Sequence, residues 1–139
     1  MDAVSNLMNE REQRFAAALK ADGLRMTHQR LEVIRELAAA KHHPDADEVY
    51  RAVRERVPTI SLDTVYRTLG TLAARGLIER ISAPGATRFD PDASAHHHFV
   101  CTRCGRIEDI EVDALGPVEI PNEIARIGAV ASVRLEMKG

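Results

Sequence analysis

Residues 61–89 read SLDTVYRTLGTLAARGLIERISAPGATRF, and their pattern changes from that of a helix to that of a hairpin. Ser61 is a favourable N-cap, and Gly76 stands where helices often stop. Two short strand-like runs then flank the Pro84-Gly85 turn. We therefore predict a helix over about 62–75, followed at once by a two-stranded hairpin. The buried stripe of the helix is predicted to be Leu62, Val65, Leu69 and Leu72.

The residues before this segment predict three further helices. A first amphipathic helix stops near Gly23, and Thr27 caps a second. Asp45, with Glu48 as its capping-box partner, opens a third helix that Pro58 ends. Helices followed by a hairpin form a winged helix, in which the helix before the wing enters the DNA major groove. We therefore expect residues 1–89 to be a winged-helix DNA-binding domain.

The polar face of the last helix carries the candidate DNA contacts. Ser61, Thr64, Tyr66 and Arg67 are side chains of the kinds that bind phosphates and base edges. The alternative is an ordinary solvated helix face. The preceding helices and the hairpin favour DNA contacts over this alternative.

The chain changes character at Asp90. Residues 90–95 are predicted to form a polar hinge. Strand-like runs at 96–101 and 106–112, a short helix near 122–127 and a last strand over 130–137 predict a small α/β domain at 96–139. The expected fold class is α+β.

Charge and composition indicate which part of the chain suits a nucleic acid, and they argue against a membrane or secreted protein. The net charge is −2, but residues 1–88 carry +2 and residues 89–139 carry −4, so the first part is better suited to face phosphate. No apolar run is long enough to cross a membrane, and the charged N-terminal region lacks the core of a signal peptide. We expect a cytoplasmic protein.

Residues 96–104 hold half of the six histidines and both cysteines. Side chains alternate along a strand, so His96 and His98 are expected to point one way and His97 the other. Asp90 and Asp109 are nearby carboxylates. Such mixed nitrogen and oxygen donors suit iron(II), manganese, zinc or nickel. The alternative is a pair of solvated histidines on an edge strand.

Cys101 and Cys104, followed by Gly105, form half of a zinc site. A structural zinc ion needs four ligands, and this chain has no other cysteine. Three interpretations stay open: no zinc site, a zinc ion completed by unusual ligands or another subunit, and a redox-active thiol pair.

Several ordered motifs then resemble one family. GLRMTHQR at 23–30, HP at 43–44, ADEVY at 46–50, SLDTVYRTL at 61–69 and HHHFVCTRCG at 96–105 resemble the ferric uptake regulator family. The resemblance implies a metal-dependent repressor that acts as a homodimer on an inverted-repeat operator in double-stranded DNA. Its C-terminal domain is expected to be the dimerisation and metal-binding domain.

The resemblance also implies the ligands of a regulatory Fe(II) or Mn(II) ion, namely His43, Asp90, His96, His98 and Asp109. An Asp at position 90 is similar to the peroxide-sensing branch of the family. That branch loses its metal and its DNA when iron and peroxide oxidise a ligand histidine, here His43 or His96.

Two departures from the family pattern affect the expected metal content. A second CxxC pair is absent, which makes a structural Zn(II) ion doubtful. The segment Ser132-Val133-Arg134 has no usual ligand for a further histidine-rich site, so we expect none.

Two alternatives remain for the function. One is a repressor on the same scaffold that senses iron, nickel or zinc. The other is a small metal- or thiol-dependent enzyme, against which we find no HExxH motif and no nucleophile elbow. We expect no enzymatic activity.

Overall fold

The computed structural model describes residues 3–139, with side chains from Glu10 onward. The chain forms two compact units. The helical unit comprises the residues up to Ser82 together with Ala86–Ala93, and the sheet unit comprises Ala83–Gly85 and Ser94–Gly139. Among the described residues, no helix is both long and apolar enough to cross a membrane.

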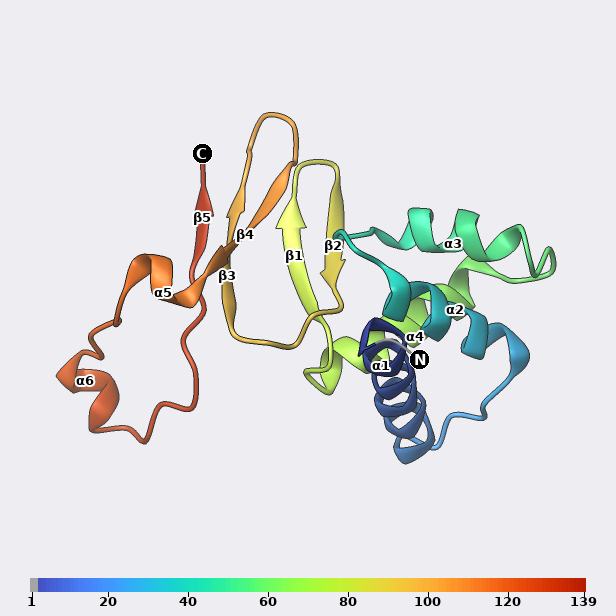
Figure 1. The fold of residues 1–139 in the computed structure, drawn as a ribbon, viewed down its shortest axis with the longest axis horizontal. Coiled ribbons are helices and arrows are strands. Elements are labelled where there is room, and N and C mark those ends of the chain that lie inside the picture. Colours follow the sequence, from blue (N-terminus) through green and yellow to red (C-terminus); the bar gives the residue numbers. More distant parts are fainter. Residues whose placement is uncertain (1–2) are drawn as a thin grey trace. The chain divides into compact units, whose positions relative to one another are not determined.

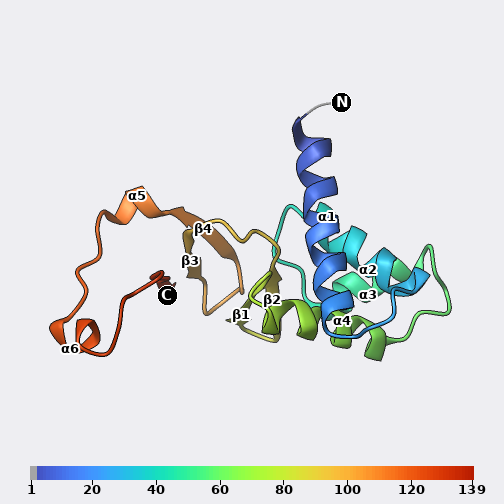
Figure 2. The same cartoon turned by 90° about the horizontal axis from the view of Figure 1, so that it is seen from below.

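The helical unit is a winged helix, as predicted. It contains four helices followed by a two-stranded hairpin (Figure 1). Figure 2 shows α1 projecting at its N-terminal end beyond the other helices of this unit. The elements are α1 (Ala3–Ala21), α2 (His28–Ala39), α3 (Ala46–Arg54), α4 (Leu62–Ala74), β1 (Glu79–Ala83) and β2 (Ala86–Asp90).

The predicted caps begin three of these helices. The side chains of Thr27, Asp45 and Ser61 accept hydrogen bonds from the third backbone N–H that follows each of them. Each cap satisfies a donor that would otherwise lack a partner in the first turn. The local sequence therefore sets where α2, α3 and α4 start.

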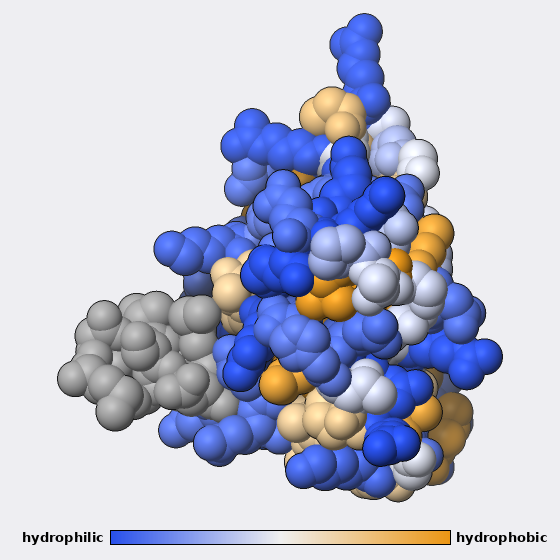
Figure 3. All heavy atoms as spheres, turned by 90° about the vertical axis from the view of Figure 1, so that its right-hand side faces the viewer, coloured by the Kyte–Doolittle hydropathy of each residue, from blue (hydrophilic) through white to orange (hydrophobic). Residues whose placement is uncertain are grey.

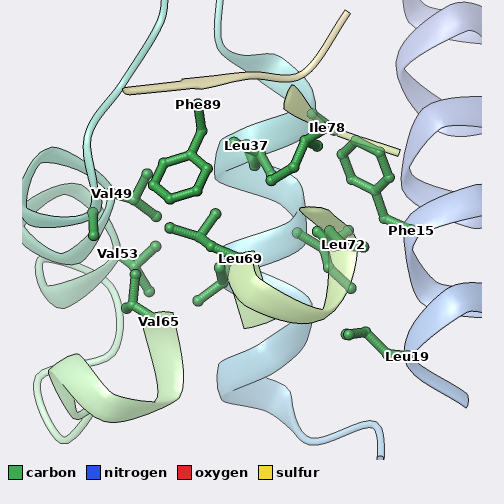
Figure 4. Close-up of a cluster of buried hydrophobic side chains, with 14 of the residues drawn as sticks. Phe15, Leu19, Leu37, Val49, Val53, Val65, Leu69, Leu72, Ile78 and Phe89 are labelled. Carbon is green, nitrogen blue, oxygen red and sulfur yellow. The ribbon is translucent and has the colours of Figure 1, made fainter. Parts of the chain in front are cut away.

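One aliphatic core holds the helical unit together (Figure 4). It brings together side chains from all four helices, from Ile78 and from Phe89 in β2. The face drawn in Figure 3 is mainly hydrophilic with small apolar patches. The labelled core residues from the helices are Phe15, Leu19, Leu37, Val49, Val53, Val65, Leu69 and Leu72.

Two details of the helices differ from the prediction. Helix α3 ends at Arg54 rather than at Pro58. Helical geometry is disfavoured at Val57, the residue before the proline, so the chain leaves the helix before it reaches Pro58. Leu62 is 37% exposed and does not belong to the core. Thr68 is buried instead, because its hydroxyl donates to the Thr64 carbonyl and no polar atom is left unpaired.

The sheet unit is built around β3 (His96–Val100). This strand pairs antiparallel with β4 (Ile107–Glu111) and parallel with β5 (Glu136–Lys138), so it is the central strand (Figure 1). The edge-strand interpretation of the histidines is therefore wrong. The last strand is also shorter than predicted, since residues 130–135 run without regular structure before β5.

The segment between β4 and β5 exposes much apolar surface. It contains two single-turn helices, α5 (Val112–Leu115) and α6 (Asn122–Ala125), on a long connection (Figure 2). No residue of either helix is buried. The large apolar residues exposed here are Val112, Leu115, Val118, Ile120, Ile124, Ile127, Val130 and Leu135.

Candidate metal centre and nucleic-acid interface

In the helical unit, the backbone brings His43 opposite Asp90. Asp45 forms an antiparallel bridge with Arg88, and the Phe89 N–H donates to the Pro44 carbonyl at 2.8 Å. Continuing that register by two residues places His43 beside Asp90. The His43 Nε2 atom lies 3.5 Å from Asp90 Oδ2. Both side chains are largely buried, and Asp90 is only 2% exposed.

Neighbouring groups hold this pair in place. The Asp90 Oδ1 atom accepts from the Asp92 N–H at 2.9 Å, which orients the carboxylate. The Arg88 Nη1 atom donates to the His43 carbonyl at 3.1 Å and to Glu48 Oε1 at 3.2 Å. The other Glu48 oxygen lies 3.1 Å from His42 Nε2. Sequence reasoning missed Arg88 as a supporting residue, because its partners lie 40 and 45 positions away.

In the sheet unit, the strand register assembles a second group of donors. His98 pairs with Asp109 across β3 and β4, and His96 lies two residues before His98 on the same face. The Asp109 Oδ1 atom is 3.4 Å from His98 Nε2 and 3.7 Å from His96 Nε2. The two imidazole rings meet edge to face, with centroids 4.6 Å apart. Both histidines are buried, and Asp109 is half exposed.

The ring orientation of His96 makes one nitrogen available as a ligand. Its Nδ1 atom lies 2.7 Å from the Ser94 carbonyl, which only accepts hydrogen bonds, so Nδ1 carries the proton. In the neutral ring, Nε2 then keeps its lone pair and faces Asp109. In metal-binding histidines, the ring nitrogen that is not a ligand usually donates its N–H to a carbonyl or carboxylate, which fixes the orientation of the ring.

His97 faces away from this group, as predicted. The Leu135 N–H donates to its Nδ1 atom at 3.0 Å, which places the proton on Nε2. Among the described residues, Nε2 has no hydrogen-bond partner although it is buried. His97 therefore ties the end of the chain to β3 and does not share a face with His96 and His98.

Each unit thus presents an imidazole next to a carboxylate. Each group mixes imidazole nitrogen with carboxylate oxygen, and such donors suit iron(II), manganese(II) or zinc(II) better than a soft metal.

The CxxC turn joins β3 to β4. The Cys101 N–H donates to the Arg106 carbonyl and the Gly105 N–H to the Cys101 carbonyl, and Gly105 has a positive φ of 78° that closes the turn. The Cys104 N–H points at the Cys101 sulfur at 3.4 Å. The backbone N–H groups of Cys104 and Arg103 lower the pKa of the Cys101 thiol. Both cysteines are free thiols.

On α4, the candidate DNA contacts divide into two kinds. Ser61 caps the helix by accepting from the Thr64 N–H, and the two hydroxyls also meet at 2.9 Å. Tyr66 is 53% exposed, and Arg67 is exposed with its guanidinium 3.0 Å from Asp63. Ser61 is exposed as well, but its hydroxyl is used in the cap, whereas the side chains of Tyr66 and Arg67 extend from the body of the helix into solvent.

Comparison with known proteins assigns both units of the chain to one family. Residues 21–138 match the sequence profile of the ferric uptake regulator family. The chain belongs to the ferric uptake regulator family. It is 33% identical over 117 residues to the peroxide-responsive repressor PerR of Staphylococcus epidermidis, covering 84% of this chain and 77% of that protein.

Two solved structures of the ferric uptake regulator family share the fold. The Campylobacter jejuni peroxide stress regulator superposes with a TM-score of 0.65 at 28% identity, over all of this chain and 96% of that one. The Pseudomonas aeruginosa ferric uptake regulator, solved with manganese, has a TM-score of 0.64 at 26% identity, over 89% of this chain and 95% of that one.

Family membership establishes the general function. Proteins of the ferric uptake regulator family are transcription regulators rather than enzymes, and they bind DNA as dimers. The chain is accordingly a metal-dependent repressor with an N-terminal winged helix and a C-terminal α/β domain.

Proposed function

We propose that this repressor responds to peroxide through one regulatory Fe(II) or Mn(II) ion. The ion is held by His43 and Asp90 from the helical unit and by His96, His98 and Asp109 from the sheet unit. The observation that carries the proposal is the pairing of imidazole with carboxylate in each unit, at 3.5 Å in one and 3.4 Å in the other.

The charges of the donors support a divalent ion. Asp90 and Asp109 together balance its two positive charges, and the neutral imidazoles add ligands without further charge. His97 lies on the opposite face of β3, which weakens the case for a histidine-rich nickel or zinc site. The carbonyl of Ser94 orients His96, and Arg88 fixes the backbone of His43.

The division of ligands between the units explains how metal controls DNA binding. Residues from both units are engaged together only in one arrangement of the winged helices, so metal binding shifts the population toward that arrangement. In a symmetric dimer, this arrangement places two copies of α4 at the spacing of two half-sites on double-stranded DNA.

The peroxide response follows from the chemistry of iron. Iron(II), when bound, supplies the electrons that reduce hydrogen peroxide beside the ligand side chains, whereas manganese(II) supports repression without that chemistry. His43 and His96 are the ligands that we expect to be oxidised. A histidine that has gained oxygen is a poorer donor, so the metal and then the operator are released. The relationship to peroxide-responsive repressors supports this proposal.

The partners follow from the two surfaces described above. Tyr66 and Arg67 on α4 are exposed and are proposed to contact the operator, with Ser61 and Thr64 at the helix start nearest the phosphates. The apolar residues of the segment 112–135 are proposed to form the homodimer interface, because an exposed apolar surface of this extent marks an association site.

The test combines peroxide with DNA binding and peptide masses. Protein loaded with iron(II) or with manganese(II) is treated with hydrogen peroxide, and operator affinity is then measured. We expect only the iron-loaded protein to lose its DNA, with one added oxygen on the peptide of His43 or His96. Fragmentation of each peptide locates the oxygen, and the adjacent His42 and His97 serve as internal controls that stay unmodified. Retention of DNA by the iron-loaded protein, with no oxygen on either histidine, would contradict the proposal.

A further inference from the structure

We propose that Cys101 and Cys104 form a reversible disulfide when hydrogen peroxide reaches them. This thiol pair is a second oxidant-sensitive site, and it requires no regulatory metal. The proposal rests on the turn between β3 and β4 alone, so it is independent of how His43 and His96 respond to peroxide.

The turn brings Cys104 back against the Cys101 sulfur. Three backbone hydrogen bonds fold residues 101–106: Cys101 N–H to the Arg106 carbonyl at 2.8 Å, Gly105 N–H to the Cys101 carbonyl at 2.9 Å, and Cys104 N–H to the Cys101 sulfur at 3.4 Å. The backbone of Cys104 therefore lies against the Cys101 sulfur, and the Cys104 side chain helps to lower the pKa of the Cys101 thiol.

The surroundings of Cys101 favour its reactive form. The Cys104 N–H points at its sulfur, and the backbone N–H groups of residues 103–105 lower the pKa of the Cys101 thiol, which favours the thiolate. Cys101 is half-buried and Cys104 is exposed, so a small oxidant has access to both. A thiolate with an adjacent second thiol is the usual arrangement of a reversible redox pair.

The end of the described chain holds the turn in this shape. The Gly139 N–H donates to the Val100 carbonyl, and the Thr102 N–H and hydroxyl both donate to the Gly139 carbonyl, at 2.7 and 3.0 Å. Thr102 lies between the two cysteines, so these bonds limit the motion of the loop. The turn that carries both cysteines therefore keeps its shape while the thiols are reduced.

The reaction has two balanced steps. The Cys101 thiolate attacks one oxygen of hydrogen peroxide, an S–O bond forms as the O–O bond breaks, and hydroxide leaves. The Cys104 sulfur then attacks the Cys101 sulfenic acid, forming the S–S bond and breaking the S–O bond. The departing oxygen takes the Cys104 proton and leaves as water. With one further proton for the hydroxide, two thiols are oxidised and one peroxide becomes two waters.

The experiment uses the full chain after removal of metal with a chelator. Hydrogen peroxide is added, remaining thiols are alkylated, and the intact mass is measured. We expect the chain to lose two hydrogens and to resist alkylation at both cysteines, and dithiothreitol to restore two alkylatable thiols. Cys101→Ser and Cys104→Ser are the matched controls, in which no intramolecular loss of two hydrogens occurs. Circular dichroism checks that both variants are folded.

Two results would overturn the proposal. One is full alkylation of both cysteines after peroxide treatment. The other is a zinc ion that copurifies with the wild-type chain but not with the serine variants, resists the chelator and keeps both thiols reduced. Neither result affects the iron-dependent oxidation of histidine, because this experiment contains no iron.

Discussion

Single hydrogen bonds decide which atoms of the candidate metal centre can act as ligands. The Ser94 carbonyl selects Nε2 of His96, and the Asp92 N–H leaves Asp90 with its Oδ2 atom toward His43. These supporting groups are part of the site, because a ligand whose orientation is not fixed loses affinity for the metal.

Asp109 provides the sharpest test at the level of a residue. We expect Asp109→Asn to lower the affinity for manganese(II) by roughly 10- to 100-fold or more, because a charged ligand is replaced by a neutral one. Its side chain is 49% exposed, so the fold should survive. Isothermal titration with manganese(II) measures the change. Glu108→Gln, which removes the same charge at the neighbouring position, should bind as the wild type does.

Arg88 tests the support of His43. We expect Arg88→Met to weaken manganese(II) binding although this side chain is not a ligand, because the His43 carbonyl and Glu48 lose their shared donor. Glu48→Gln should have a smaller effect, since it leaves the bond from Arg88 to His43 in place. Equal manganese affinity in the Arg88 variant and the wild type would show that the bond does not position the ligand.

Glu32 makes the stability of the helical unit depend on pH. The Arg56 guanidinium, 3.0 Å away, holds the pKa of this buried carboxyl below its usual value, and Arg35 adds to the effect. A lowered folded-state pKa gives stability that is complete above the unfolded-state pKa of about 4.3 and is lost as pH falls through the folded value. Urea unfolding of wild type and Glu32→Gln should therefore converge in acid. A constant difference between them would contradict this role.

At the level of elements, the sequence predicts helix starts well because a cap is a local interaction. Thr27, Asp45 and Ser61 each bond a backbone N–H three residues later, so the information lies within one turn. The alternation that separates His97 from His96 and His98 is equally local. In contrast, the central position of β3 depends on pairing with β5, nearly 40 residues away in the sequence. No local sequence pattern predicts that pairing.

The reading helix α4 gives a prediction at the same scale. We expect Arg67→Ala to weaken operator binding by roughly 5- to 150-fold, as for the loss of one base contact. Its ion pair with Asp63 is exposed and contributes little to stability, so the melting temperature should change little. Arg103→Ala in the sheet unit removes the same charge and is the control in a gel-shift titration. Equal losses in both variants would point to a general effect of charge.

At the scale of the whole molecule, the account requires one metal ion to use ligands from both units. The presence of a histidine and an aspartate in each unit was predictable from motif resemblance, whereas their local pairing follows from the bridge at Asp45 and the register of β3 with β4. The exposed apolar segment 112–135 adds a second requirement, namely that the active protein is a dimer.

The most direct test of the shared ion is a double-mutant cycle on manganese(II) affinity, using His43→Ala, His98→Ala and the variant with both changes. If one ion binds both units, each single variant loses affinity and operator binding, and the combined loss is far from the sum of the two. The wild type should then bind one regulatory ion per chain. Wild-type manganese affinity in His43→Ala, or two additive losses with two ions per chain, would contradict the account.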